Sequence, residues 1–239
     1  TEAYTLTGDK NTLGECYISD ITTVEKGSYN KNAVVMNFRH ATSKVRIALY
    51  ETVPGYVISD VKFHDAAWNN GEYTVGKAEG TLFGTFNKKG TMTVYFPTTG
   101  TNNKTENSSD YNKAHVKFVA DKTDGTESTI NFGTVNYGND EENAIKKGTT
   151  YLSQTAANPS YCGDKANNQT YYQTVLPAEN ASEPASIRID YKLTATDGSN
   201  EVINVKNATA TIPAAYTAWK HGYAYTYIFK ISHNTNGTT

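Results

Sequence analysis

The residue types that carry catalysis and metal binding are few in this chain and widely spaced. The histidines are His40, His64, His115, His221 and His233. No two of them stand at metal-site spacing, and no H-E-x-x-H motif, nucleophile elbow, P-loop or EF-hand loop occurs. The acidic run at 140–142 is typical of a solvated loop. We therefore expect no catalytic centre, no metal site and no cofactor.

The two cysteines, Cys16 and Cys162, are far apart and fit neither C-x-x-C nor zinc spacing. They are compatible with two free thiols or with one disulfide that closes a long loop. We expect the disulfide, which requires an oxidising compartment. No signal peptide or lipidation motif occurs at Thr1, which is compatible with a cytosolic protein or with a trimmed mature form. The expected disulfide favours the trimmed, exported form.

Aromatic side chains offer another kind of site, because their ring faces can stack on sugars. Trp68 precedes Asn69-Asn70-Gly71 and is the candidate for an exposed aromatic at a turn. Most tyrosines instead stand at alternating strand positions, which favours a structural role. A carbohydrate-binding module is thus the alternative to a structural protein.

The composition indicates an all-β protein that does not bind nucleic acid. The 239 residues carry a net charge of −2, and only 37% of them are hydrophobic. Threonine and tyrosine suit strands, while asparagine and glycine suit turns. A nucleic-acid partner calls for a basic patch, which the charge balance does not indicate. No apolar run approaches the roughly 18 residues of a membrane span.

Period-2 alternation predicts about nine or ten short strands, and no segment has a long helical stripe. The expected strands are 34–38, 44–49, 57–63, 80–86, 90–96, 115–120, 129–136, 170–176, 187–193, 202–212 and 223–231. We expect hairpins between 80–86 and 90–96 and between 187–193 and 202–212. Long polar loops should span 98–113 and 137–169, the second with a weak helical turn at 141–147.

Strand 223–231 is apolar on both faces, so we expect it to be central in its sheet. The expected core residues include Phe38, Ile47, Tyr225 and Phe229. Together these patterns predict a Greek-key β-sandwich with long loops.

Two segments resemble strands of the fimbrillin family, the type V pilins of Bacteroidales. The first runs M-N-F-R-H-A-T-S-K-V-R-I over 36–47, and the second extends over 212–231 to end in Y-A-Y-T-Y-I-F-K-I. The matching residues are Phe38, His40, Ala41, Lys44, Val45, Trp219, Gly222, Tyr225, Tyr227 and Phe229. In the second segment Tyr223 follows Gly222 directly, which departs from the family pattern.

The resemblance implies a structural or adhesive subunit of a fimbria on the bacterial outer membrane, without enzymatic activity. Its fold would be transthyretin-like. Its partners would be other fimbrial subunits, joined by β-strand addition, and a surface glycan or protein.

Only some 35 residues precede the first motif, which in the family opens a second domain. We therefore expect residues 1–30 to be a lead-in with short strands and 31–239 to form one sandwich domain. The docking groove should lie beside a strand near a terminus, with 1–18 the natural region. The polar tail 232–239 should not act as a donor strand.

Overall fold

The computed structural model describes residues 2–20, 22, 24, 26–27, 33–69, 72–79, 81–82, 89–96, 114–120, 130–131, 135–137, 151–163, 171–177 and 185–235. The protein consists mostly of β-strands arranged in several antiparallel sheets. Its buried apolar residues form a larger and a smaller cluster. The predicted loop at 98–113 and the predicted helical turn at 141–147 lie outside the described residues.

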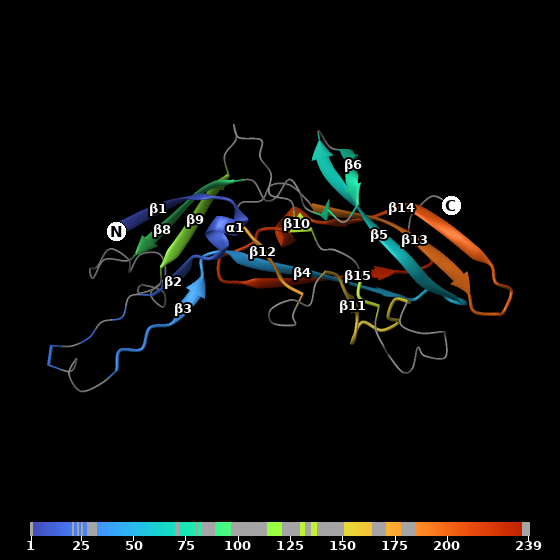
Figure 1. Ribbon diagram of the computed structural model, residues 1–239, viewed down its shortest axis with the longest axis horizontal. Helices are drawn as coiled ribbons and strands as arrows, with labels where there is room; N and C mark the ends of the chain where they lie inside the picture. Colours follow the sequence, from blue (N-terminus) through green and yellow to red (C-terminus); the bar gives the residue numbers. More distant parts are fainter. Residues whose placement is uncertain are drawn as a thin grey trace.

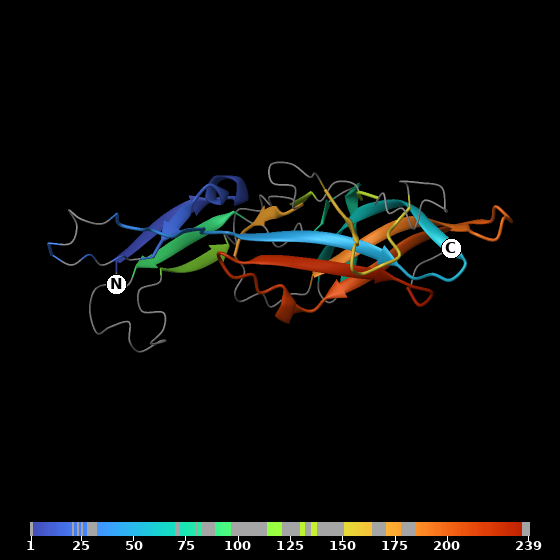
Figure 2. The same ribbon diagram turned by 90° about the horizontal axis from the view of Figure 1, so that it is seen from below.

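Two sheets enclose the larger cluster, and Figures 1 and 2 show them as two layers. The first is built on β4 (Ser43–Glu51), which pairs in parallel with β15 (Ala224–Ile231). On its other edge, β4 pairs antiparallel with β11 (Ser160–Tyr161) and β12 (Gln173–Val175). The second sheet has the order β14 (Val202–Ile212), β13 (Ala185–Ala195), β5 (Tyr56–Asn69) and β6 (Glu72–Glu79).

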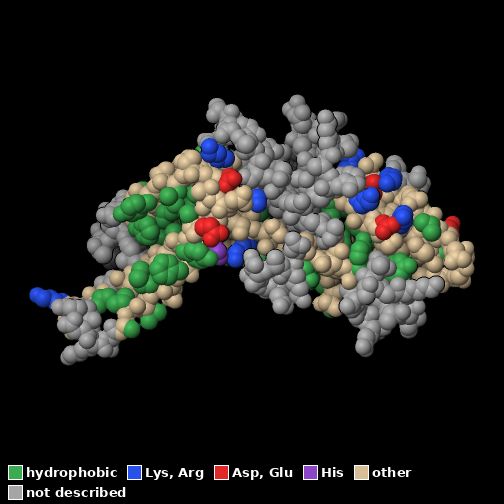
Figure 3. Space-filling view, viewed as in Figure 1, with side chains coloured by type: hydrophobic (Ala, Val, Ile, Leu, Met, Phe, Trp, Pro, Cys, Tyr) green, Lys and Arg blue, Asp and Glu red, His purple; other side chains and the backbone are tan. Residues whose placement is uncertain are grey.

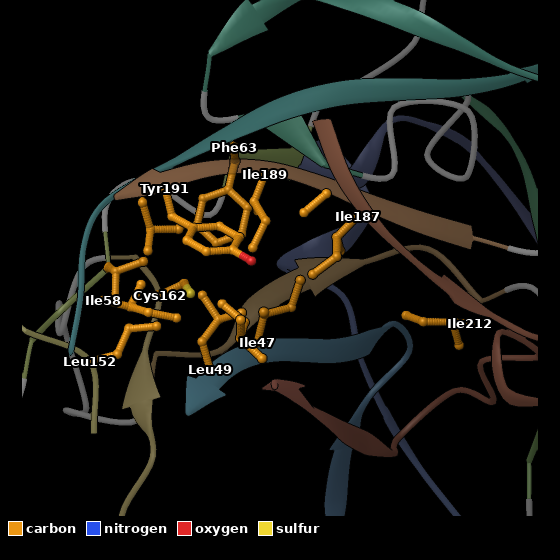
Figure 4. Close-up of a cluster of buried hydrophobic side chains, with 14 of the residues drawn as sticks. Ile47, Leu49, Ile58, Phe63, Leu152, Cys162, Ile187, Ile189, Tyr191 and Ile212 are labelled. Carbon is orange, nitrogen blue, oxygen red and sulfur yellow. The ribbon is translucent and has the colours of Figure 1, made fainter. Parts of the chain in front are cut away.

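Period-2 alternation decides which side chains enter the larger cluster. Val45, Ile47 and Leu49 of β4 are fully buried, because successive side chains of a strand point to opposite faces. Opposite them lie Phe63 of β5 and Ile189 of β13. Figure 4 shows both converging with Ile47 and Leu49 between the two sheets. Full burial of such aliphatic side chains contributes about 1.5–3 kcal/mol each.

The predicted hairpin between 187–193 and 202–212 is confirmed as β13 and β14. Its turn contains Gly198 and Asn200, both with positive φ, which suits these two residue types. The register shifts once within the β13–β14 pair, where the carboxylate of Asp190 accepts the backbone N–H of Asn207 at 2.9 Å. This contact fixes the irregular position without disrupting the ladder on either side.

The smaller cluster is formed by residues between Leu13 and Val116 together with Leu176. The sheet order is β1 (Glu2–Gly8), β8 (Gly90–Phe96) and β9 (His115–Ala120), all antiparallel. A five-residue helix, α1 (Lys10–Gly14), and the pair β2 (Tyr17–Ser19) and β3 (Phe38–His40) lie beside it. The division into a lead-in at 1–30 and a domain at 31–239 stays a prediction.

The predicted hairpin between 80–86 and 90–96 is wrong. Strand β8 pairs with β1 on one edge and β9 on the other, so no edge is left for 80–86. The described part of that segment, β7 (Thr81–Leu82), pairs with β10 (Ile130–Asn131) instead. The N-K-K-G sequence at 87–90 predicted a turn between two neighbouring segments. The strands that pair with β8 are instead β1 and β9, which are not adjacent to that turn.

The predicted disulfide between Cys16 and Cys162 is also wrong, because both cysteines are free. Cys16 packs against the smaller cluster, whereas Cys162 is fully buried in the larger one. Burial raises the pKa of the Cys162 thiol, because the interior disfavours the thiolate. The positions of the two cysteines in the sequence did not indicate that they belong to different clusters of buried residues.

Candidate strand-docking groove

The two sequence motifs lie side by side in the structure. Strands β4 and β15 pair in parallel in unbroken register from Lys44–Ala224 to Glu51–Ile231. The register places Val45 beside Tyr225 and Leu49 beside Phe229. The motifs are about 180 residues apart in sequence, so this long-range pairing makes them one structural unit.

The turn before β15 is fixed by bonds to the start of β4. The buried hydroxyl of Ser43 donates to the carbonyl of Lys220 at 2.7 Å, and the N–H of Gly222 donates to the carbonyl of Thr42 at 2.8 Å. Gly222 has a φ of +73°, and an added Cβ would stand 3.2 Å from Cδ of Arg39. These two features explain why glycine occupies this position.

Tyrosine hydroxyls tie the inner face of β15 to the segment that precedes it. The indole Nε1 of Trp219 donates to the hydroxyl of Tyr227 at 2.8 Å, and that hydroxyl donates to the carbonyl of Tyr216. The N–H of Lys220 donates to the hydroxyl of Tyr225 at 2.8 Å. Both rings are therefore held in one orientation, and burial raises the pKa of Tyr227.

An open groove of about 470 Å³ runs along this face of β15. Its lining residues come from the end of β14, the 3₁₀ turn η4 (Ala214–Tyr216) and β15 itself. They are Thr211, Ile212, Pro213, Ala215, Tyr216, Ala218, Tyr225, Thr226, Tyr227, Ile228 and Phe229. In Figure 4, Ile212 stands apart from the densely packed part of the cluster.

Strand β15 lies at the edge of its sheet, so the prediction that it is central is wrong. Among the described residues its sole strand partner is β4. Its burial alternates, with Tyr225, Tyr227 and Phe229 half-buried and Ala224, Thr226, Ile228 and Lys230 exposed. The apolar Ala224 and Ile228 suggested a second buried face, yet both point to solvent.

The free edge of β15 presents backbone groups from alternate residues. The carbonyls of Tyr223 and Ile231 accept the N–H groups of Lys44 and Thr52, at 3.0 and 2.8 Å. Because N–H and C=O groups alternate sides along a strand, the odd-numbered residues bond to β4. The N–H and C=O groups of Thr226 and Ile228 therefore point outward, where an added strand can pair with them.

The structure places the ten predicted motif residues at different depths. Ala41, Val45 and Trp219 are buried; His40, Lys44, Tyr225, Tyr227 and Phe229 are half-buried; Phe38 and Gly222 are exposed. The core prediction is therefore wrong for Phe38, which is 63% exposed, while Ile47 is fully buried. Phe38 lies on the outward face of the β2–β3 pair. The side chain of Trp68 lies outside the described set.

A cluster of tyrosines lies on the opposite, outer face of the β4–β15 pair. The guanidinium of Arg46 lies 4.7 Å from the ring centre of Tyr161 and 4.5 Å from that of Tyr172. Tyr171 stacks on Tyr161 at 5.3 Å, and Arg46 and Tyr172 both bond to the hydroxyl of Thr226. Sequence reasoning missed this cluster, because Arg46, Tyr161, the pair Tyr171 and Tyr172, and Thr226 come from four separate segments.

Two histidines, His40 and His221, lie near the junction between the two motifs. Burial, with the charges of Arg39 and His115, lowers the pKa of His221 to about 4. Burial and Lys44 also lower the pKa of His40, whose ring lies 4.3 Å from that of Tyr17. Both imidazoles are therefore neutral at neutral pH. No group of three or more His, Cys, Asp or Glu residues that could bind a metal occurs among the described residues.

We expect the stability of the protein to fall as the pH drops from about 6.5 to about 4. In this range the unfolded chain protonates His221 while the folded chain does not, so protons favour unfolding. After allowance for the partial exposure of the ring, the loss should be about 1–2 kcal/mol. Urea titrations of wild type and His221→Gln at several pH values measure it. Equal pH slopes for the two proteins would contradict this assignment.

The fold and site thus define a β-rich protein in which the edge of β15, without a second strand partner among the described residues, lies beside a groove. Within the described residues, no helix has the length and apolar character needed to span a membrane. A solved fimbrial protein from Bacteroides vulgatus is similar in structure, with a TM-score of 0.43 and 12% sequence identity. The alignment covers 85% of this chain and 55% of that protein, so this chain spans about half its length. No family model and no curated protein matches the sequence.

Proposed function

We propose that this protein is a structural or adhesive subunit of a fimbria on the bacterial outer membrane. Its subunits join by β-strand addition, and it has no enzymatic activity. The observation that carries this proposal is the free edge of β15 beside the apolar groove. An unpaired edge is a pairing template, and natural proteins normally cover or charge such edges.

The chemistry of the groove supports strand addition over binding of a small polar ligand. Its inner wall consists of Tyr225, Tyr227 and Phe229, and the hydroxyls of Tyr225 and Tyr227 are already bonded within the chain. The outward N–H and C=O groups of β15 supply hydrogen bonds to any extended main chain. An incoming strand would bond through its backbone and bury alternate apolar side chains.

The sequence motifs support the same proposal. The segments that resemble fimbrillin strands include β4 and β15, which pair with each other, and β15 lines the groove. A transthyretin-like Greek-key topology and an extracellular location are part of the proposal and rest on that resemblance.

We expect Ile228→Pro to abolish assembly while leaving the subunit folded. Proline removes the outward N–H of residue 228 and is tolerated on an edge strand where that N–H faces solvent. Ile228→Thr keeps the N–H and is the matched control. Analytical ultracentrifugation and electron microscopy of the purified chains should show filaments for wild type and Ile228→Thr alone. Filaments of Ile228→Pro, or a wild type that stays monomeric at all concentrations, would refute strand addition at this edge.

The tyrosine cluster around Arg46 supports a second candidate function, binding of a surface carbohydrate. The rings of Tyr161, Tyr171 and Tyr172 lie partly exposed on the outer face, where sugar rings could stack. On this interpretation Tyr172→Ala abolishes binding on a glycan array. Tyr223→Ala, at an exposed tyrosine outside the cluster, leaves it unchanged. A wild-type protein that binds no glycan rejects this function.

A further inference from the structure

An apolar segment of this chain projects into solvent, and most of its side chains are exposed. Residues 33–38, called the arm below, include Val34, Val35, Met36 and Phe38, which are 50%, 70%, 50% and 63% exposed. Figure 3 shows hydrophobic side chains following this projection toward its tip at the lower left. Contiguous exposed apolar surface of this kind marks an interaction site, whereas single exposed apolar residues are ordinary.

The backbone of the arm before Phe38 is available for pairing, whereas Phe38 itself already pairs with Ser19 of β2. Residues 33–37 belong to no strand, and β3 begins only at Phe38. Val35 accepts a bond from the hydroxyl of Thr22, but at 3.5 Å this contact is long. In extended form the arm would place Val34, Met36 and Phe38 on one face and Val35 and Asn37 on the other.

The apolar face of the arm matches the inner wall of the groove. Tyr225, Tyr227 and Phe229 alternate along β15 with the same two-residue spacing as Val34, Met36 and Phe38, roughly 6.6 Å. The groove lies open beside them. An arm paired with the free edge of β15 would direct its three apolar side chains into this space and leave Asn37 in solvent.

The arm and the groove of one molecule point in opposite directions. In Figure 1 the arm extends to the lower left, whereas β15 runs toward the right from the turn that precedes it. The pairing of Ser19 with Phe38 and the 2.8 Å ion pair between Arg39 and Asp20 hold the base of the arm in this direction. An arm that enters this groove must therefore come from another molecule.

We propose that the arm of one copy of this chain inserts into the groove beside β15 of a second copy. The contact joins different surfaces of the two molecules, so each bound copy still offers one free arm and one free groove. Such a contact does not close on itself and produces an open filament. This inference rests on the proposed function and specifies its donor strand.

Two single substitutions in the arm test the donor. Met36→Asp places a charge on the face that enters the groove and should abolish filaments in ultracentrifugation and electron microscopy. Val35→Asp adds the same charge one residue earlier, on the face that stays in solvent, and should assemble like wild type. The two variants have the same net charge, so a difference in their assembly shows which face of the arm enters the groove.

A mixing experiment separates failure of this inference from failure of the proposed function. Met36→Asp keeps its groove and Ile228→Pro keeps its arm, so their mixture should give a one-to-one complex that grows no further. If Met36→Asp forms filaments while Ile228→Pro does not, strand addition stands and the donor is another segment, such as β1 or the tail. If wild type remains monomeric, or Ile228→Pro assembles normally, the proposed function itself fails.

Discussion

Replacing Trp219 by alanine should lower the free energy of unfolding by about 3–5 kcal/mol. Trp219 is fully buried and is among the largest buried side chains of the protein. Its loss leaves a cavity in the larger cluster. It also removes the indole N–H that donates to the hydroxyl of Tyr227 at 2.8 Å. Equilibrium unfolding in urea, followed by far-ultraviolet circular dichroism, measures the change.

Trp219→Phe is the matched control, because it keeps an aromatic ring but cannot donate the hydrogen bond. We expect it to cost about 1–2 kcal/mol, from the lost bond and the smaller volume. Its structural effect should be largest at the inner wall of the groove, because the Trp219 side chain no longer holds the hydroxyl of Tyr227 there. A Trp219→Ala protein as stable as wild type would show that the indole does not support the core.

The strands themselves could be predicted from sequence wherever one face is buried and the other is solvated. Strand β4 and the β13–β14 hairpin were predicted on this basis, because period-2 alternation reports the two faces directly. Which strands pair with each other was harder to predict from the sequence. The parallel pairing of β4 with β15 and the antiparallel pairing of β1 with β8 join residues far apart in sequence. No local turn chemistry specifies them.

The groove could not be predicted from the sequence, for a related physical reason. The apolar residues Ala224 and Ile228 of β15 predicted burial, but an apolar side chain is compatible with exposure when a strand is at an edge. The same ambiguity affects Val34 and Met36, whose alternation with Phe38 predicted a strand over 34–38, although both are 50% exposed and residues 33–37 belong to no strand. In both segments the apolar side chains that suggested burial are exposed in the structure.

Leu13→Ala should destabilise the smaller cluster by about 2–5 kcal/mol and leave the larger cluster unchanged. Leu13 is 1% exposed, and the one-turn helix α1 holds it against Met92 and Val116 of the neighbouring sheet. Asp9 caps this helix through the N–H groups of Asn11 and Thr12, at 3.0 and 2.9 Å. Hydrogen exchange followed by mass spectrometry resolves the effect by segment. Leu6→Ala, at a position on β1 that is 41% exposed and outside the cluster, is the control and should change less.

The pattern of exchange also tests whether residues 1–30 are a separate lead-in. Strand β8 bonds to β1 along its whole length, so loss of packing at Leu13 should increase exchange in β8 and β9 as well as in β1. Contiguous segments that open together form one cooperative unit. Strand β4 and β15 should keep their protection, because their buried side chains belong to the larger cluster. Faster exchange confined to residues 1–20 would support a boundary near residue 30. Faster exchange throughout β4 and β15 would show that the two clusters unfold as one.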